Sequence, residues 1–181
     1  MALFIVSCNA SKKSIKRDKI ETDYLLLNQL LDNAVKLHQD KNISFKESNN
    51  NEFIISIIKE LKKHDFESNK SKLDSLKKDI GIYNDKKFED IFNQNEYDFL
   101  IYQNENSTWD YNKINDTKIH KYKKGVFIEK QITIQISKPI YTIDKKYAII
   151  FVGKNTSSYM LIYKKEGQAW VECRLFYPRL G

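Results

Sequence analysis

The stretch 147-YAIIFVGKNTSSYMLIYKKEGQAW-170 decides the fold class of this chain. Two apolar runs rich in β-branched and aromatic residues are separated by the polar segment KNTSS, and the segment EGQ follows the second run. Short apolar runs bounded by Gly, Asn and Ser are typical of β-strands joined by tight turns. The stretch therefore predicts two strands of an antiparallel meander and the start of a third, which continues through VECRLFY to residue 177.

Toward the N-terminus, an alternating pattern from Gly125 adds one more strand to this meander. One face of this strand is apolar and consists of Val126, Ile128, Ile132, Ile134 and Ile136. Lys130 interrupts this face, which indicates an edge strand or a β-bulge. Ser-Lys-Pro at 137–139 ends the strand, because proline cannot donate to a ladder. With YDFLIYQ at 97–103 as an optional fifth strand, we expect a four- to five-stranded antiparallel meander sheet.

Before residue 95 the hydrophobic period is that of helices. Residues 20–40 and 52–64 carry apolar positions at i, i+3 or i+4, and i+7; those we expect to face inward are Ile20, Tyr24, Leu27, Leu31, Ala34, Val35, Phe53, Ile54, Ile57, Ile58 and Leu61. Residues 70–81 predict a third helix ending at Gly81, residues 85–94 a short fourth, and residues 41–51 a loop. Helices followed by strands indicate an α+β fold, with the N-terminal helices packed on the antiparallel meander.

Composition limits the classes of protein to which the chain can belong. Its 181 residues fit one domain with a real core, and no apolar run approaches the roughly 20 residues of a membrane span. The net charge is +7, but only Arg17, Arg174 and Arg179 are arginine. Specific base readout and tight phosphate binding favour the guanidinium group, so we do not expect a specific nucleic-acid binder. The lysines are spread along the chain among acidic residues, and lysine, asparagine and isoleucine are abundant together, which indicates the codon bias of an AT-rich genome. The alternative is a functional cationic surface, which favours acidic protein partners or anionic lipid.

The first residues, MALFIVSC, allow three interpretations. As a strand, Leu3 to Val6 is a short apolar run. As an ordinary secretory signal the segment is too short, because such a signal needs about 7–15 apolar residues behind a positively charged segment. As the end of a bacterial lipoprotein signal, Ile5-Val6-Ser7-Cys8 resembles the lipobox, with a branched apolar residue three positions before the cysteine and a small residue directly before it.

This resemblance implies that Cys8 is lipidated and becomes the first residue of the mature chain. Residues 1–19 are then a signal remnant and a flexible tether, and residues 20–181 are a single α+β domain with a helical part at 20–95 and a β-sheet part at 97–177. No basic segment precedes the apolar run, which is about half the usual length. Either the chain is therefore truncated at its start, or the match is chance and the segment is a structural strand or a frayed terminus.

Residues 132–175 also resemble a unit found in small exported bacterial lipoproteins of unknown function. The shared features are a strand ending in Ser-x-Pro, a strand led by Tyr-Ala and a Gly-x-x-Trp hairpin; the matching residues are Ser137, Pro139, Tyr147, Ala148, Tyr163, Gly167 and Trp170. Many members of that group carry a turn rich in Gly and Cys where this chain has GKNTSS. The resemblance implies a location in the cell envelope, and it supplies no reaction and no catalytic residue.

No catalytic, cofactor-binding or metal-binding pattern is present in the sequence. His38, His64 and His120 do not stand in a metal-binding motif, and Cys173 is not part of a Cys-His motif. The isolated glycines form no phosphate-binding loop. We therefore expect a protein that is not an enzyme and that needs no cofactor.

One aromatic cluster is a candidate protein interface. Trp109 lies in the polar segment NENSTWDYNKIND, with Tyr102, Tyr111 and Tyr122 nearby in the sequence. Trp and Tyr are enriched at the hot spots of protein interfaces, so these four residues are candidates for partner binding. The alternative is that Trp109 folds back onto the sheet.

These observations lead us to expect a non-catalytic lipoprotein, anchored in the cell envelope through lipid on Cys8 and facing the periplasm, that binds a protein partner. Its most concrete form is an immunity protein that neutralises an interbacterial toxin. The main alternative is an envelope structural or sensing lipoprotein that binds a glycan or a small ligand. A hydrolase with unrecognised residues and a cytosolic nucleic-acid binder are further alternatives.

Overall fold

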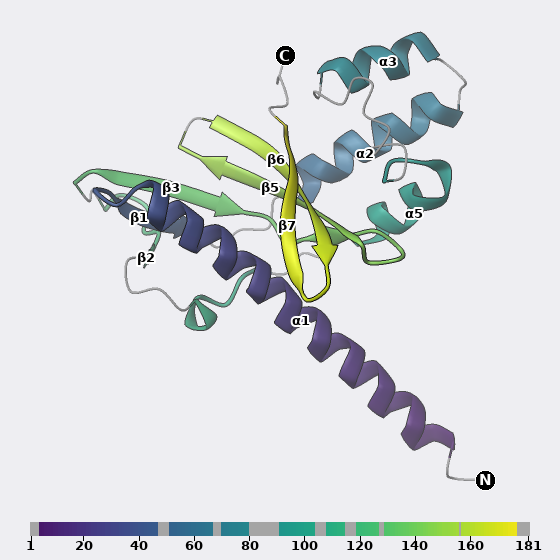
Figure 1. Cartoon of the computed structure of the whole chain (residues 1–181), viewed down its shortest axis with the longest axis horizontal. Coiled ribbons are helices and arrows are strands. Elements are labelled where there is room, and N and C mark those ends of the chain that lie inside the picture. The colour runs from purple at the N-terminus through teal and green to yellow at the C-terminus, as the bar shows by residue number, and fades with distance from the viewer. Residues whose placement is uncertain are drawn as a thin grey trace.

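The computed structural model describes residues 4–46, 51–66, 70–79, 91–103, 108–114, 119–126, 129–155 and 157–176. The chain is α+β, as expected, with one sheet between two groups of helices (Figure 1). Helix α1 (Phe4–Leu37) covers one face of the sheet, while α2 (Asn51–Phe66) and α5 (Gln94–Tyr102) pack on the other. Helix α3 (Lys70–Asp79) adjoins α2. Gly81 and most of the expected short helix at 85–94 lie outside the described residues.

The predicted meander is confirmed. Strands β3 (Gln131–Ile136), β5 (Tyr147–Lys154), β6 (Ser157–Glu166) and β7 (Ala169–Phe176) pair in sequence order, each antiparallel to the next. A two-residue strand, β4 (Ile140–Tyr141), pairs with β5. Strand β3 begins at Gln131 rather than at Gly125, because Glu129 and Lys130 form a turn in which Lys130 has a positive φ of 53°. It ends before Ser137, as the Ser-x-Pro pattern predicted.

The sheet is nevertheless mixed, so the prediction of a purely antiparallel sheet was wrong. The order is β2-β1-β3-β5-β6-β7, where β1 (Asn42–Lys46) and β2 (Ile119–Lys121) lie parallel to their neighbours. Strand β1 falls where the sequence predicted a loop. Its two apolar residues, Ile43 and Phe45, stand in the polar segment KNISFKESNNN, and the strand is held by pairing with β3, a partner far away along the chain. Such long-range pairing leaves no local signal in the sequence.

The expected strand at 97–103 was also wrong, since these residues belong to α5. Asn93 caps this helix, because its side chain accepts a hydrogen bond from the Asn95 backbone N–H at 3.0 Å. Tyr97 and Leu100, three positions apart, form the buried side, and the Tyr97 hydroxyl donates to the Phe92 carbonyl at 3.1 Å. An apolar run this short fits the period of a strand as well as that of a helix, and packing against α2 favours the helix. Helices are therefore not confined to the N-terminal part of the chain.

Helix α1 is longer than the helix expected from Ile20, since it begins at Phe4. Its buried side follows i, i+3, i+4, i+7 spacing through Asp23, Leu26, Leu27, Leu30 and Leu31. Ile20, expected to face inward, is 37% exposed. Figure 1 shows the N-terminal part of the helix extending beyond the sheet. That residues 1–19 are a signal remnant and tether stays a prediction, and the backbone of this segment is helical from Phe4.

Two hydrogen bonds fix the position of α1 along the sheet. The Tyr141 hydroxyl donates to the Asp23 carboxylate at 2.7 Å, and both side chains are buried. Gln29 donates through its side-chain amide to the Trp170 carbonyl at 3.0 Å. Burial, and then the Asp23 carboxylate, raise the pKa of the Tyr141 phenol far above its usual value, so that this hydroxyl remains the donor. The helix therefore cannot slide along the sheet without breaking buried polar contacts.

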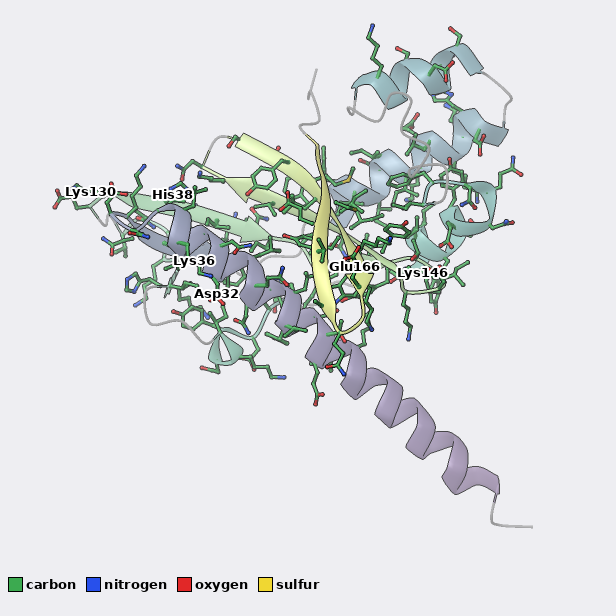
Figure 2. All side chains as sticks on the ribbon, in the orientation of Figure 1. Asp32, Lys36, His38, Lys130, Lys146 and Glu166 are labelled. Atoms are coloured by element: carbon green, nitrogen blue, oxygen red, sulfur yellow. The ribbon has the colours of Figure 1, made fainter. Side chains whose placement is uncertain are left out.

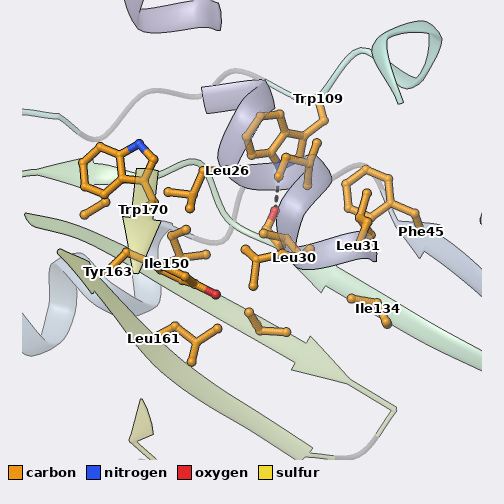
Figure 3. Packing of buried hydrophobic residues seen from close by; sticks show 14 of the residues in the cluster. Leu26, Leu30, Leu31, Phe45, Trp109, Ile134, Ile150, Leu161, Tyr163 and Trp170 are labelled. Carbon is orange, nitrogen blue, oxygen red and sulfur yellow. Dashed lines mark hydrogen bonds between the residues drawn. The ribbon is translucent and has the colours of Figure 1, made fainter. Parts of the chain in front are cut away.

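The core between α1 and the sheet is made of leucines from the helix and of β-branched and aromatic residues from the strands (Figure 3). Trp109 belongs to this core and is only 2% exposed. Its indole N–H donates to the Ile136 carbonyl at 2.7 Å, its ring meets Tyr24 edge-on at 5.2 Å, and the Lys138 ammonium lies 3.6 Å from the ring centroid. Trp109 thus folds back onto the end of β3.

We predict that Leu31→Ala destabilises the chain by about 2–5 kcal/mol, because it leaves a cavity between α1 and the sheet. Leu25→Ala, on the same helix but at a side chain that is 56% exposed, is the matched control and should change the free energy of unfolding by about 0.5 kcal/mol or less. Urea unfolding followed by circular dichroism measures both values. Equal losses in the two variants would contradict the packing of α1 described above.

We also predict that the fluorescence of Trp109 is shielded from solvent in the folded chain. In a Trp170→Phe variant, Trp109 is the remaining tryptophan, and acrylamide should quench it several-fold less in buffer than in concentrated urea, because the folded protein buries its ring. The urea-unfolded variant is the internal control. A quenching constant in buffer equal to the unfolded value would place Trp109 on the surface instead.

Candidate binding surface

Part of one sheet face carries no described helix. Helices α2 and α5 pack on β4, β5 and β6, where Ile149, Phe151 and Ile162 form the second core. On the same face of β1 and β3 the side chains are polar, with Ser44, Thr133 and Gln135 among them. Thr133 and Gln135 are half-buried, whereas Ser44 is buried and accepts a hydrogen bond from the Gln131 side-chain amide at 2.5 Å. A polar sheet face opposite a buried apolar face is typical of a surface that meets solvent.

Two hollows lie at this end of the sheet. The first has a volume of about 340 Å³ and is lined by Tyr111, His120, Lys121, Lys123, Val126 and Gln131. The second has a volume of about 300 Å³ and is lined by Lys46, Tyr122, Thr133, Gln135, Gly153 and Asn155. We call the residues that line these two hollows the lysine-rich edge. No acidic residue lines either hollow within the described part of the chain.

Local structure holds the two tyrosines of this edge in place. Tyr111 begins the short 3-10 helix η1 (Tyr111–Lys113), which Asp110 caps by accepting from the Asn112 backbone N–H at 3.1 Å. The Tyr111 hydroxyl donates to the Ile119 carbonyl of β2. Tyr122 directly follows β2, and its backbone N–H donates to the Phe45 carbonyl at 2.9 Å. The Tyr111 ring is therefore held through its hydroxyl, whereas the hydrogen bond of Tyr122 fixes its backbone at the edge of the sheet.

More lysines surround the lysine-rich edge. Figure 2 shows Lys36, His38 and Lys130 together at the end of the molecule where α1 ends and β3 begins. Lys41, Lys123 and Lys124 are also exposed near this end. Carboxylates are interspersed among these lysines, since Asp40 precedes Lys41 and acts on His38, Glu129 precedes Lys130, and Asp32 lies near Lys36 (Figure 2). The excess of lysine over acidic residues is therefore a property of the described lining of the two hollows and not of this whole end of the molecule.

The four aromatic residues named as a candidate interface do not form one surface. Tyr111 and Tyr122 lie at the lysine-rich edge, in separate hollows. Trp109 is in the core, and Tyr102 is 87% exposed at the end of α5. Cys8, the candidate lipidation site, lies in the helical backbone of α1. The lysines of the two hollows escaped the sequence analysis, because lysine is frequent along the whole chain and only the fold brings these ones together.

A third hollow, of about 350 Å³, lies between the C-terminal part of α1 and strand β6. The Lys154 ammonium donates to Nε2 of His38 at 2.7 Å in this groove. Partial burial, then Lys154 and Lys41, lower the pKa of His38, so its imidazole is neutral near pH 7. Tyr159, Leu161 and Tyr163 line this groove from one face of β6, and nothing in the sequence indicated that α1 leaves space beside them.

The remaining titratable candidates are dispersed over the structure. His64, on α2, lies 3.6 Å from Glu60, whereas His38 and His120 lie at the groove and at the lysine-rich edge. Cys173 is half-buried, and its thiol donates to the Ile162 carbonyl at 3.3 Å. Among the described residues, no group of three or more His, Cys, Asp or Glu side chains is arranged to hold a metal ion.

Comparison of the chain with protein-family models, with curated proteins and with solved structures finds no match to any of them. Within the described ranges, no helix has the length and the apolar character needed to cross a membrane. A functional conclusion therefore depends on the residues and the geometry of this chain, and above all on the lysine-rich edge.

Proposed function

We propose that this chain is a non-catalytic lipoprotein of the cell envelope that binds a protein partner through the lysine-rich edge. In its most concrete form it is an immunity protein that neutralises a toxin delivered by a neighbouring bacterium. The observation that carries the proposal is the lysine-rich edge itself, in which lysines and two tyrosines line two hollows whose described lining residues include no acidic side chain.

Several properties of this edge suit a protein partner. Lys46, Lys121 and Lys123 are exposed, so they can steer an acidic surface toward the sheet and raise the rate of association. Tyr111 and Tyr122 are half-buried and held by backbone contacts, so they lose little conformational entropy when a partner covers them. Lysine favours charge complementarity over the bidentate readout of bases, so we propose no specific nucleic-acid partner.

The location in the envelope rests on the lipobox-like Ile5-Val6-Ser7-Cys8 and on the shape of α1. The sheet packs on α1 only from Asp23 onward among the residues whose side chains are described. From Cys8 to Asp23 a helix rises about 22 Å at 1.5 Å per residue. Lipid on Cys8 would then hold the sheet clear of the bilayer at the end of a helical spacer (Figure 1), with the protein facing the periplasm.

The test of the binding function is a competition between bacteria. Deletion of the gene should make the producing strain sensitive to its toxin-delivering sister strain, and the wild-type gene should restore survival. The triple variant Lys46→Glu, Lys121→Glu and Lys123→Glu should restore it at least tenfold less well, because the acidic partner is then repelled. Survival after co-culture, counted as colonies, is the measurement.

The matched control reverses three exposed lysines elsewhere, Lys59, Lys63 and Lys78 of α2 and α3, which produces the same change in net charge. This control should protect as well as the wild type. Immunoblots confirm that all variants accumulate equally. Unchanged survival of the deletion strain against every delivered toxin would contradict the immunity function, and equal protection by both triple variants would contradict the lysine-rich edge as the binding surface.

The test of the anchor uses Cys8→Ser in the full chain expressed from its native locus. The wild-type protein should appear in the membrane fraction with the mass of a chain that begins at a diacylated or triacylated Cys8. The serine variant should lose the lipid and leave the membrane fraction, since serine cannot form the thioether. An unmodified wild-type chain that retains residues 1–7 would contradict the anchor and leave the protein-binding test unaffected.

One observation favours the alternative of an envelope lipoprotein that binds a glycan. In the second hollow, Thr133, Gln135 and Asn155 offer uncharged hydrogen-bonding groups beside the ring of Tyr122. Amides, hydroxyls and an aromatic face are the groups that fix polar ligands in pockets. Binding of soluble glycans that survives the lysine reversals and disappears with Tyr122→Ala would support this alternative.

A further inference from the structure

The groove between α1 and β6 has a different chemistry from the lysine-rich edge. Leu30 and Ala34 of α1 form one wall, and Leu161 of β6 forms the floor. The lining residues of β6 run from Ser157 to Tyr163, a length of about 20 Å along an extended strand. The hollow is therefore long and apolar at its centre, and its charged groups lie toward its two ends.

One end of the groove is cationic. Lys154 is opposite Ser157 in the β5–β6 register, and its ammonium donates to the imidazole of His38. His38 is neutral near pH 7, so it offers the ammonium a hydrogen bond and no counter-charge. In the described part of the chain Lys154 has no carboxylate partner. An anionic group that entered this end would therefore meet a partly desolvated positive charge.

The other end of the groove is acidic. Glu172 is opposite Tyr163 in the β6–β7 register. The Tyr163 side chain is 1% exposed, and no hydrogen bond of ordinary geometry engages its hydroxyl among the described residues. Glu172 and Tyr163 both line the groove, and burial, then Glu172 and Tyr159, raise the pKa of the Tyr163 phenol. Figure 3 shows the Tyr163 hydroxyl turned toward the side of the core on which Leu30 lies.

We propose that this groove binds a short apolar peptide with two free ends. The carboxylate of the peptide pairs with Lys154, its ammonium pairs with Glu172 beside the Tyr163 hydroxyl, and its apolar side chains lie on Leu30, Ala34 and Leu161. Four extended residues span about 14 Å, and the long Lys154 side chain covers the remaining distance. Opposite charges at the two ends of an apolar groove favour this dipolar ligand over a fatty acid, whose tail would end at Glu172.

The test uses the purified full chain and the tetrapeptide Leu-Ala-Leu-Ala in calorimetric titrations. The peptide with free ends should bind saturably, and amidation of its carboxylate or acetylation of its amine should each weaken binding about tenfold, because one charged contact is lost. In Lys154→Met, amidation should have no further effect. In Glu172→Gln, acetylation should have no further effect. Each protein variant combined with a capped peptide forms a double-mutant cycle, and the two cycles assign each end of the peptide to one residue.

The matched controls are Lys164→Met and Glu166→Gln. Both residues are exposed on β6, and the Lys164 ammonium lies 4.0 Å from the Glu166 carboxylate. Both should bind the free peptide as the wild type does, and circular dichroism should show that all four variants are folded. Three outcomes would overturn the proposal: no saturable binding, equal binding of the free and the capped peptides, or an unchanged effect of amidation in Lys154→Met. None of them bears on the lysine-rich edge, which lies on other residues.

Discussion

The packing of the leucine side of α1 against the sheet is the interaction on which the rest of the structure depends. The strands present Phe45, Ile134, Ile150 and other apolar side chains on that face, and α1 is the described helix that removes them from water. Each buried leucine contributes about 1.5–3 kcal/mol, so the helix supplies much of the hydrophobic stabilisation. The buried bond from Tyr141 to Asp23 adds little to this total but sets the register of the helix.

The two proposed binding surfaces follow from the uneven covering of the sheet. Helix α1 crosses one face and leaves a groove beside β6. On the other face, α2 and α5 pack on β4, β5 and β6, whereas β1 and β3 present polar residues. The same arrangement therefore produces an apolar groove with charged ends and a lysine-rich edge, and both are consequences of where the helices stop.

Trp109 illustrates how a residue in a polar stretch of sequence can belong to the core. It is surrounded in the sequence by polar side chains, which made it a candidate for an exposed interface. In the structure its loop crosses the end of β3, where the Ile136 carbonyl needs a donor and Tyr24 and Lys138 supply ring and cation contacts. At this one position the indole ring donates a hydrogen bond to Ile136 and contacts Tyr24 and Lys138. None of these three residues is close to Trp109 in the sequence.

The sequence by itself determined the antiparallel meander of β3, β5, β6 and β7, the helical pattern of α2 and of the part of α1 from Ile20 onward, and the end of β3 at Ser137. These features are encoded by periodicity and turn chemistry over a few neighbouring residues. Only the tertiary structure decided that 42–46 is a strand, that 97–102 is helical, that Trp109 is buried, and that Lys46, Lys121 and Lys154 face hollows. Each of these outcomes depends on partners distant in the chain, because pairing, burial and charge clustering are properties of surfaces that form only when the chain folds.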